Sequence, residues 1–271
     1  RVGRFAANVE PKVIQLEQNR VDLIFEIIEG PPTGIKSISF IGNKHFSDRA
    51  LKGVIQTKES RWYRYFSSSD SYDPDRLTFD RELLRRHYLK KGYPDFRVLS
   101  SVAELTDNRK DFFVTLTIEE GERYKFGESN ILSKIADLNG EQFIDKIQFK
   151  DQDWYNSELI DDTVIGITEG VGNLGYGFVN VLALTKKDRT NRTMELTFEI
   201  GEAPRVFVEK IDIRGNVRTL DRVIRREFRL VEGDLFNASK LRRSRTRIRN
   251  LGFFEKVTVG TAIGSSPDKT I

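Results

Sequence analysis

The sequence contains no cysteine, two histidines and one methionine among 271 residues. Without cysteine the chain has no disulfide framework, no thiolate zinc site and no cysteine nucleophile. His45 and His87 form neither an HxH nor an HxxxH pair, so we expect no histidine metal site. No apolar run approaches the length of about 18 residues that a membrane-spanning helix needs. No P-loop, dinucleotide fingerprint or Ser-His-Asp order is present. We therefore expect no cofactor and no enzymatic activity.

The chain is instead rich in charge, at 32% of its residues, and it contains 19 phenylalanines. This composition is typical of several small domains in a row rather than of a disordered chain. The net charge of +4 is uneven, because residues 205–256 hold 15 Lys and Arg against 7 Asp and Glu, a net of +8, which leaves −4 elsewhere. Such a basic region is compatible with nucleic acid, anionic lipid, an acidic partner or a solvated surface.

The clearest pattern in the sequence is an order of elements over residues 208–259. An alternating apolar run ends at Gly215, and two helical stretches separated by residues 232–234 follow it. The second helical stretch ends at Gly252, where an aromatic strand is expected to begin. The pattern predicts a strand, two helices and a strand. Residues 268–271 are expected to begin the final strand.

Two weaker copies of this order begin at Ile35 and Tyr124. Gly92, Gly175 and Gly252 each precede an aromatic residue and lie 83 and 77 residues apart. Because the same glycine–aromatic signal recurs at a period near 80 residues, the sequence indicates a true repeat. The repeated unit reads β-α-α-β-β, which predicts an α+β fold of tandem domains. Each domain is expected to hold a three-stranded mixed sheet with two helices on one face.

Helix-capping residues and alternating apolar residues predict the elements of the first repeat. A short helix is expected to begin at Ser47 or Asp48 and a longer one at Asp73-Pro74. Gly92 ends the longer helix. We expect one strand from Tyr93 to Leu99 and a second over residues 112–118.

The second repeat shows the same signals in a weaker form. Its long helix is expected to begin at Asn156 or Ser157, and Gly166 and Gly170 should weaken it. Alternating apolar residues predict a last strand over residues 194–200. A loop-like aromatic segment in the first repeat either forms a contact patch or folds back on its own domain. Its aromatic residues are Trp62, Tyr63, Tyr65 and Phe66.

The element order, the Gly-Asn turn, the Gly-aromatic helix end and the Glu-Gly strand end resemble POTRA domains. These are the periplasmic repeats of outer-membrane protein assembly factors of the BamA type. Residues 213–259 are similar to the family's final, barrel-proximal repeat, and residues 72–98 are similar to its third. The resemblance covers the whole chain and implies four parts. They are residues 1–33 (the end of a second repeat), 34–122 (a third), 123–204 (a fourth) and 205–271 (a fifth without most of its last strand).

The resemblance implies a periplasmic scaffold of a Gram-negative outer membrane that binds accessory lipoproteins and nascent outer-membrane proteins. It places the site for a BamD-like lipoprotein at Arg225 and Glu232, which lie seven residues apart. About two helical turns separate such positions, so both side chains can share one side of the domain. An ordinary exposed ion pair is the alternative.

The basic helix of the third repeat is a second candidate surface, for lipid headgroups or a partner. A solvated face is an equally good explanation. A nucleic-acid-binding repeat protein is the alternative function, although no aromatic RNA-binding strand or GxxG clamp supports it, and we expect no nucleic-acid partner. The arginines of this helix are Arg242, Arg243, Arg245, Arg247 and Arg249.

An edge strand in the first repeat is the third candidate. Its unpaired backbone groups could accept an extended polypeptide as a further strand, with little dependence on sequence. Five backbone bonds of about 1 kcal/mol each would barely exceed the cost of association, so binding should be weak. The residues expected at this edge are Phe96, Arg97, Val98, Leu99, Ser100 and Ser101.

Overall fold

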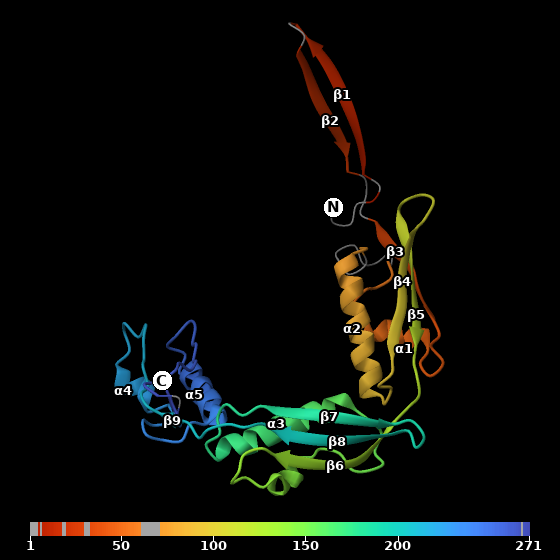
Figure 1. Ribbon diagram of the computed structural model, residues 1–271. Coiled ribbons are helices and arrows are strands. Elements are labelled where there is room, and N and C mark those ends of the chain that lie inside the picture. Colours follow the sequence, from red (N-terminus) through yellow and green to blue (C-terminus); the bar gives the residue numbers. More distant parts are fainter. Residues whose placement is uncertain (1–4, 6, 18–19, 30–32, 61–70, 267) are drawn as a thin grey trace. The chain divides into compact units, whose positions relative to one another are not determined.

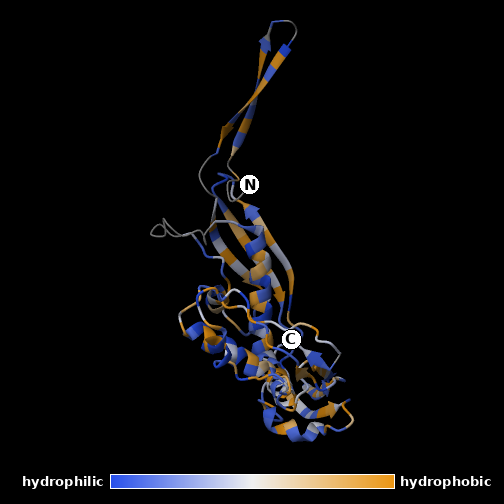
Figure 2. Ribbon diagram, turned by 90° about the vertical axis from the view of Figure 1, so that its left-hand side faces the viewer, coloured by the Kyte–Doolittle hydropathy of each residue, from blue (hydrophilic) through white to orange (hydrophobic). Residues whose placement is uncertain are grey.

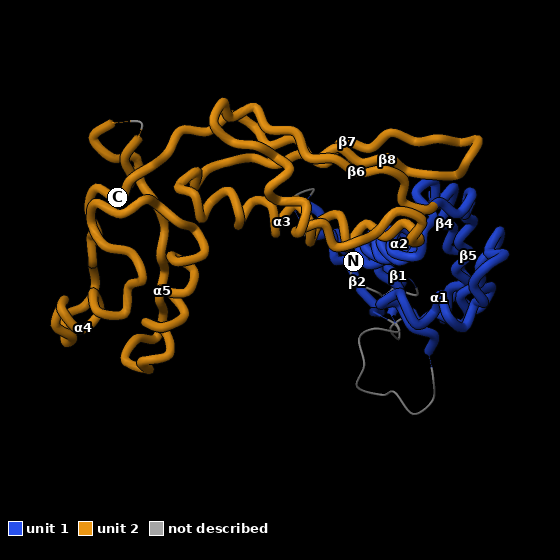
Figure 3. Tube along the Cα trace, turned by 90° about the horizontal axis from the view of Figure 1, so that it is seen from below, with its two compact units in different colours: residues 1–124 blue, residues 125–271 orange. Residues whose placement is uncertain are grey.

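The computed structural model covers residues 1–271 and describes all of them except residues 1–4, 6, 18–19, 30–32, 61–70 and 267. The chain divides into two compact units, residues 1–124 and residues 125–271 (Figure 3). The first unit holds a hairpin and the first repeat, and the second unit holds the other two repeats. The aromatic segment around Trp62 and Tyr63 lies outside the described residues.

The first repeat is a three-stranded sheet whose central strand is the last one in sequence (Figure 1). Its elements are β3 (Gly34–Ile41), α1 (Asp48–Val54), α2 (Pro74–Lys90), β4 (Arg97–Leu105) and β5 (Asp111–Glu119). The central strand β5 pairs parallel with β3 and antiparallel with β4. Alternate side chains of β5, from Phe112 to Ile118, are buried in one core with the apolar faces of α1 and α2. This mixed architecture confirms the predicted α+β class.

The helices of the first repeat begin where their polar caps predict. The Ser47 hydroxyl accepts a hydrogen bond from a backbone N–H of the first turn of α1. The Asp73 carboxylate does the same for α2, and Pro74 occupies the first turn. Helix α2 ends before Gly92, whose φ of +100° lies in the left-handed region that favours glycine.

The strand expected from Tyr93 to Leu99 instead runs from Arg97 to Leu105. Tyr93 and Phe96 are both buried, and the Phe96 ring stacks on that of Tyr88 with centroids 4.0 Å apart. The predicted start of the strand was therefore wrong, because these aromatic side chains fill the core beneath the turn that follows α2.

The N-terminal hairpin consists of β1 (Asn8–Leu16) and β2 (Arg20–Ile28), which pair antiparallel. Apolar residues alternate along β2, yet every side chain of this strand is exposed. Hydrophobic and hydrophilic residues are interspersed along the hairpin (Figure 2). A hairpin without a third strand or a covering helix buries neither of its faces.

The second repeat has the same topology. Its elements are β6 (Lys125–Ser133), the 3-10 helix η2 (Gly140–Lys146), α3 (Ser157–Asn173), β7 (Val181–Asp188) and β8 (Thr193–Ile200). The central strand β8 pairs parallel with β6 and antiparallel with β7. Its four alternate apolar side chains, from Met194 to Ile200, are buried as predicted. A 3-10 helix replaces the short α-helix of the first repeat.

The third repeat has a shorter sheet. Its elements are β9 (Phe207–Val208), α4 (Asp221–Arg225), α5 (Ala238–Asn250) and β10 (Lys269–Thr270). Strand β10 pairs parallel with β9, as β5 does with β3, so residues 268–271 begin the last strand as predicted. The strands expected over residues 208–213 and 253–259 do not form, apart from Val208 in β9. In the other repeats the central strand is the strand with which both outer strands pair. In the third repeat the central strand β10 supplies only two paired residues, so it offers the outer strands little to pair with.

Direct side-chain contacts connect the second and third repeats. Phe178 and Phe236 stack with ring centroids 4.9 Å apart. The Asn237 amide nitrogen donates a hydrogen bond to the Asn173 amide oxygen at 2.6 Å. These contacts agree with the assignment of both repeats to one compact unit.

Candidate partner-binding surfaces

Arg225, one of the two residues expected to bind a partner, is held by three acceptors at the end of α4. Its Nε donates to Asp221 at 2.7 Å, and its terminal nitrogens donate to Glu232 at 3.2 Å and to the backbone carbonyl of Ile211 at 2.7 Å. Glu232 also accepts the backbone N–H of Ile211 at 3.0 Å. The ion pair therefore binds both backbone groups of Ile211, a residue that lies outside the strands assigned in the described part of the chain.

The structure brings Arg225 and Glu232 together through a turn and not along one helix. Helix α4 ends at Arg225, and Glu232 lies in a turn with Gly233, whose φ is +91°. The two side chains do share one side of the domain, as expected, but a turn rather than continuous helical spacing brings them together. Asp221 was missed, and its i, i+4 spacing to Arg225 is the signal that could have identified it.

The Arg225–Glu232 pair is fixed in place and still accessible. The hydrogen bond from the Ile211 N–H lowers the pKa of Glu232, and Arg225 lowers it further. The two side chains remain 40% and 47% exposed. The guanidinium uses three N–H groups in these bonds, and an arginine has five to donate. The pair thus presents a positioned cation and anion to solvent.

The arginines of the basic helix α5 are all exposed but have different surroundings. Arg242 forms an ion pair with Glu169 of α3, and Arg247 lies 2.8 Å from Glu227. Ser244 and Ile248 hold the opposite side of the helix in the core. In the part of the chain that the structure describes, three arginines of α5 have no ion-pair partner. They are Arg243, Arg245 and Arg249.

The six residues expected to form an open edge in the first repeat, Phe96 to Ser101, lie at the edge strand β4 or just before it. Phe96 precedes the strand and is buried, and the Arg97 guanidinium binds Glu119 at 2.8 Å. Leu99 is the extra residue of a β-bulge between Val98 and Ser100. The regular part of this edge therefore begins at Ser100.

Backbone groups that point away from the sheet can be assigned on β4. The N–H of Thr106 donates to Asp111, which makes these two residues a hydrogen-bonded pair at the end of the ladder. Such pairs alternate along an antiparallel ladder. The N–H and C=O groups of Ser101, Ala103 and Leu105 consequently point away from β5.

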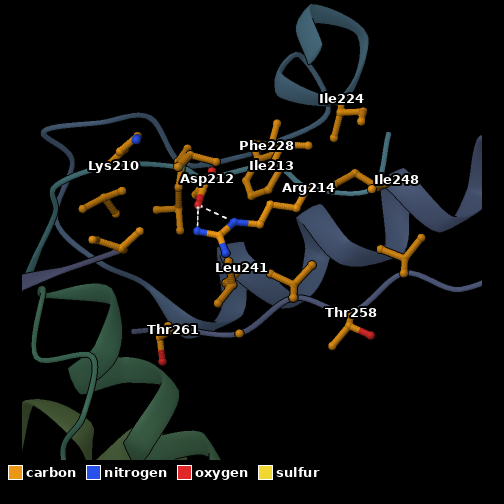
Figure 4. Close-up of a pocket in the computed structure, with 18 of the residues that line it drawn as sticks. Lys210, Asp212, Ile213, Arg214, Ile224, Phe228, Leu241, Ile248, Thr258 and Thr261 are labelled. Carbon is orange, nitrogen blue, oxygen red and sulfur yellow. Dashed lines mark hydrogen bonds and ion pairs between the residues drawn. The ribbon is translucent and has the colours of Figure 1, made fainter. Parts of the chain in front are cut away.

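A groove of about 310 Å³ lies in the third repeat between residues 208–216 and 256–261. Arg214 is drawn in Figure 4 with its bonds to Asp212, whose oxygen accepts hydrogen bonds of 2.6 and 2.8 Å. The Arg214 guanidinium lowers the pKa of Asp212. The sequence positions of the two walls match the strands that flank the central strand in the other repeats. The groove is thus a consequence of the short sheet.

Neither a metal site nor a membrane helix is found in the described ranges. Over these residues no three His, Asp or Glu side chains gather in a metal-binding group. No helix among them combines the length and the apolar character needed to cross a membrane.

Comparison with known proteins agrees with this architecture. Residues 33–121, 124–203 and 206–271 match POTRA, described as surface antigen variable number repeat. The outer membrane protein assembly factor BamA of Neorickettsia risticii is 33% identical over 92% of the chain, and BamA of Neisseria meningitidis is 27% identical over 98%. The chain spans about a third of the length of these relatives, 33% and 34% respectively.

A solved structure shows the same fold. The POTRA3-5 crystal structure of Haemophilus influenzae BamA aligns with 88% of this chain and 93% of its own, at a TM-score of 0.73 and 22% identity. The three matched segments cover most of the sequence. The chain belongs to the POTRA family.

Proposed function

We propose that this chain is the periplasmic repeat region of an outer-membrane β-barrel assembly factor and acts as a non-enzymatic scaffold. The observation that carries the proposal is the run of three POTRA matches, together with relatives named as outer membrane protein assembly factors. Two features of the described residues support a scaffold: an accessible, positioned ion pair in the third repeat and an open strand edge in the first.

The Arg225–Glu232 pair is the proposed docking point for a BamD-like accessory lipoprotein. Because Asp221 and the Ile211 backbone already orient the pair, little conformational entropy remains to be lost when a partner binds. The two remaining guanidinium N–H groups suit a carboxylate, and the Glu232 carboxylate suits a cationic side chain. The pair therefore favours a partner surface with both charges.

Charge reversal at Glu232 tests this docking point. Glu232→Lys should weaken binding of the purified lipoprotein at least about tenfold, since a buried, hydrogen-bonded charge pair at an interface contributes well over 1.4 kcal/mol. Isothermal titration calorimetry measures the affinity. Arg214→Ala is the matched control, because Arg214 is an exposed arginine of the same repeat that binds one carboxylate, Asp212.

The proposed docking point would be disproved by unchanged lipoprotein affinity in Glu232→Lys. Native-like amide spectra of α5 in both variants would show that the repeat remains folded. Equal losses in Glu232→Lys and Arg214→Ala would point to a general charge effect and would also contradict the assignment.

The free arginines of α5 form the proposed contact with the outer-membrane surface. Arg243, Arg245 and Arg249 are exposed, and Arg245 and Arg249 repel each other at i, i+4 unless an anion lies between them. Each basic group near an anionic membrane contributes about 1 kcal/mol. Sedimentation with phosphatidylglycerol vesicles should fall in the triple alanine variant and not in Arg242→Ala. Equal sedimentation of the triple variant and the wild type would exclude the contact.

The open edge of β4 is the proposed acceptor for nascent outer-membrane proteins. Ser101, Ala103 and Leu105 present unpaired backbone groups, so an extended chain can add there as a strand. Weak binding suits a scaffold that must pass many different chains onward.

A further inference from the structure

The chain has two histidines, and the fold brings both to the same end of the first repeat. His45 lies in the turn after β3, and His87 lies in the last turn of α2. The Phe46 ring has its centroid 5.1 Å from that of His87 and 5.0 Å from that of Tyr88. The His45 ring lies 5.1 Å from the ring of Tyr93. Both imidazole rings therefore belong to one aromatic cluster.

The two imidazole rings of this cluster have opposite surroundings. The Nδ1 atom of His45 lies 2.6 Å from the Glu120 carboxylate, which would match a positive charge on that ring. The Nε2 atom of His87 is buried and has no hydrogen-bond partner among the described residues. A neutral imidazole can leave this nitrogen without a hydrogen, whereas an imidazolium carries an N–H there. Protonation of His87 would therefore create a buried donor without an acceptor, at a cost to the folded state.

The positive charges near the His87 ring add to this cost. Burial lowers the pKa of His87 below its ordinary value of 6.5, and the charges of Lys91 and Lys90 on the same helix lower it further. The end of a helix favours a cation, but these two lysines already supply that charge.

The carboxylates on the neighbouring elements bind other groups. At the start of α1, Asp48 accepts a hydrogen bond from the Asn43 side chain at 2.8 Å. At the end of β5, Glu120 accepts the Tyr88 hydroxyl and contacts His45. Neither carboxylate is a partner of the His87 Nε2 atom. The titratable groups of the turn after β3, the start of α1 and the end of β5 are Lys44, His45, Asp48 and Glu120.

His87 lies where α2 holds the segment that follows β5. The His87 carbonyl accepts the N–H of Lys91 at 3.1 Å, which closes the last turn. The Lys91 carbonyl accepts the Nε of Arg123 at 3.0 Å, and the Gly92 carbonyl accepts the N–H of Tyr124 at 2.8 Å. Loosening of the last turn would therefore also weaken the hold on the segment after β5.

The repeated fold does not require a histidine at this position. Fourteen positions after the N-cap of the long helix, the three repeats carry His87, Gly170 and Leu251. Of these three side chains, only that of the first repeat can be protonated near neutral pH.

We propose that His87 is a pH-sensitive switch at the end of the first repeat. While its ring is neutral, the last turn of α2 packs on Phe46 and holds Arg123 and Tyr124. Protonation of the ring loosens this turn and its hold on these two residues. The inference goes beyond the proposed scaffold function, and its test needs neither a partner nor a membrane, so the failure of one leaves the other standing.

The direction of the pH response follows from the lowered pKa of His87 in the folded state. The stabilising contribution of the neutral ring is complete above about pH 6.5 and is lost as the pH falls from there through the folded pKa. This window lies above the range in which Glu120 titrates, since the pKa of Glu120 is below its ordinary value of 4.5.

NMR of the isotope-labelled chain tests the proposal in two ways. The His87 ring signals should titrate below pH 6.5, the ordinary value for histidine. Amide exchange, corrected for the intrinsic exchange rate, should show that the protection of Lys91 and Tyr124 falls at least about fivefold between about pH 7.5 and pH 5.5, as expected for an unpaired buried donor. His87→Phe keeps a ring against Phe46 and cannot be protonated, so it should abolish this fall.

The other histidine provides the matched control. His45→Gln should keep the fall in protection, because His45 is the only other histidine of the chain. Protection that is constant with pH in the wild type, or that falls equally in His87→Phe, would overturn the proposal. Loss of the response in His45→Gln alone would assign it to His45 and would also overturn it. The ring titration of the wild type decides independently of any variant: a His87 pKa at or above 6.5 would show that its surroundings stabilise the cation.

Discussion

At the scale of single residues, Glu120 joins three segments of the first repeat. Its carboxylate is only 5% exposed. It accepts hydrogen bonds from the Tyr88 hydroxyl at 2.8 Å, from the His45 backbone N–H at 3.2 Å and, at 2.6 Å, contacts the His45 ring nitrogen Nδ1. The end of α2, the turn after β3 and the end of β5 are thereby held together. This explains the Glu in the Glu-Gly strand end of this repeat.

Replacement of Glu120 should be costly. Glu120→Gln weakens the bonds to Tyr88 and His45, and an unsatisfied buried partner costs about 1–3 kcal/mol. We expect a loss of that size in the free energy of opening of β5, measured by native-state amide exchange at pH 7. Glu119→Gln is the control, since Glu119 is exposed, and should change far less. Equal effects of the two variants would contradict the role assigned to Glu120.

The contribution of Glu120 should depend on pH. Burial raises its pKa, but hydrogen bonds from His45 and Tyr88 outweigh burial, and the pKa lies below its ordinary value. A carboxylate with a lowered folded pKa stabilises fully above its unfolded pKa of about 4.3 and loses this stabilisation as the pH falls through the folded value. The stability difference between the wild type and Glu120→Gln should therefore shrink below about pH 4.

At the scale of elements, the packing of η2 on α3 depends on one of the two glycines expected to weaken that helix. A Cβ on Gly170 would lie 2.9 Å from the Phe143 ring of η2. A Cβ on Gly166 would make only ordinary contact, at 3.5 Å from Lys146. Gly170 permits close approach of the two helices, whereas Gly166 has no such role.

The two glycines of α3 should therefore respond oppositely to alanine. Gly166→Ala should raise the stability of the second repeat by up to about 1 kcal/mol, the difference in helix propensity. Gly170→Ala should lower it, because the Phe143 ring must move and the core loses contacts. Amide exchange of the β8 residues reports both changes. Stabilisation by both substitutions would show that η2 does not pack tightly on α3.

At the scale of the whole molecule, the three repeats share one order of elements and differ in how far the central strand extends. Gly42 and Gly215 occupy the same turn in the first and third repeats, with φ values of +95° and +84°. A Cβ on Gly42 would lie 2.1 Å from the carbonyl oxygen of Ile118 in β5. A Cβ on Gly215 would meet no atom within 4 Å.

Alanine at these two glycines compares the repeats directly. Both substitutions carry the left-handed backbone cost of about 1–2 kcal/mol. Gly42→Ala adds a clash with the central strand, so it should destabilise its repeat by more than about 2 kcal/mol. Amide exchange of β5 and of α5 measures the two effects. A larger loss for Gly215→Ala would contradict the different packing of the two turns.

The sequence by itself determined the repeat, the helix caps and the alternation of the central strands. These features follow from patterns within a few residues, such as Asp73-Pro74 at the start of α2 or Met194 to Ile200 in β8. The resemblance to POTRA domains pointed to Arg225 and Glu232, and their spacing was compatible with one side of the domain. Tertiary structure alone decided that Phe96 is buried, that Leu99 forms a bulge and that residues 253–259 form no strand. It also decided that Ile211 joins the Arg225–Glu232 pair. The reason is that local propensity is read within one element, whereas pairing and burial depend on partners distant in the chain.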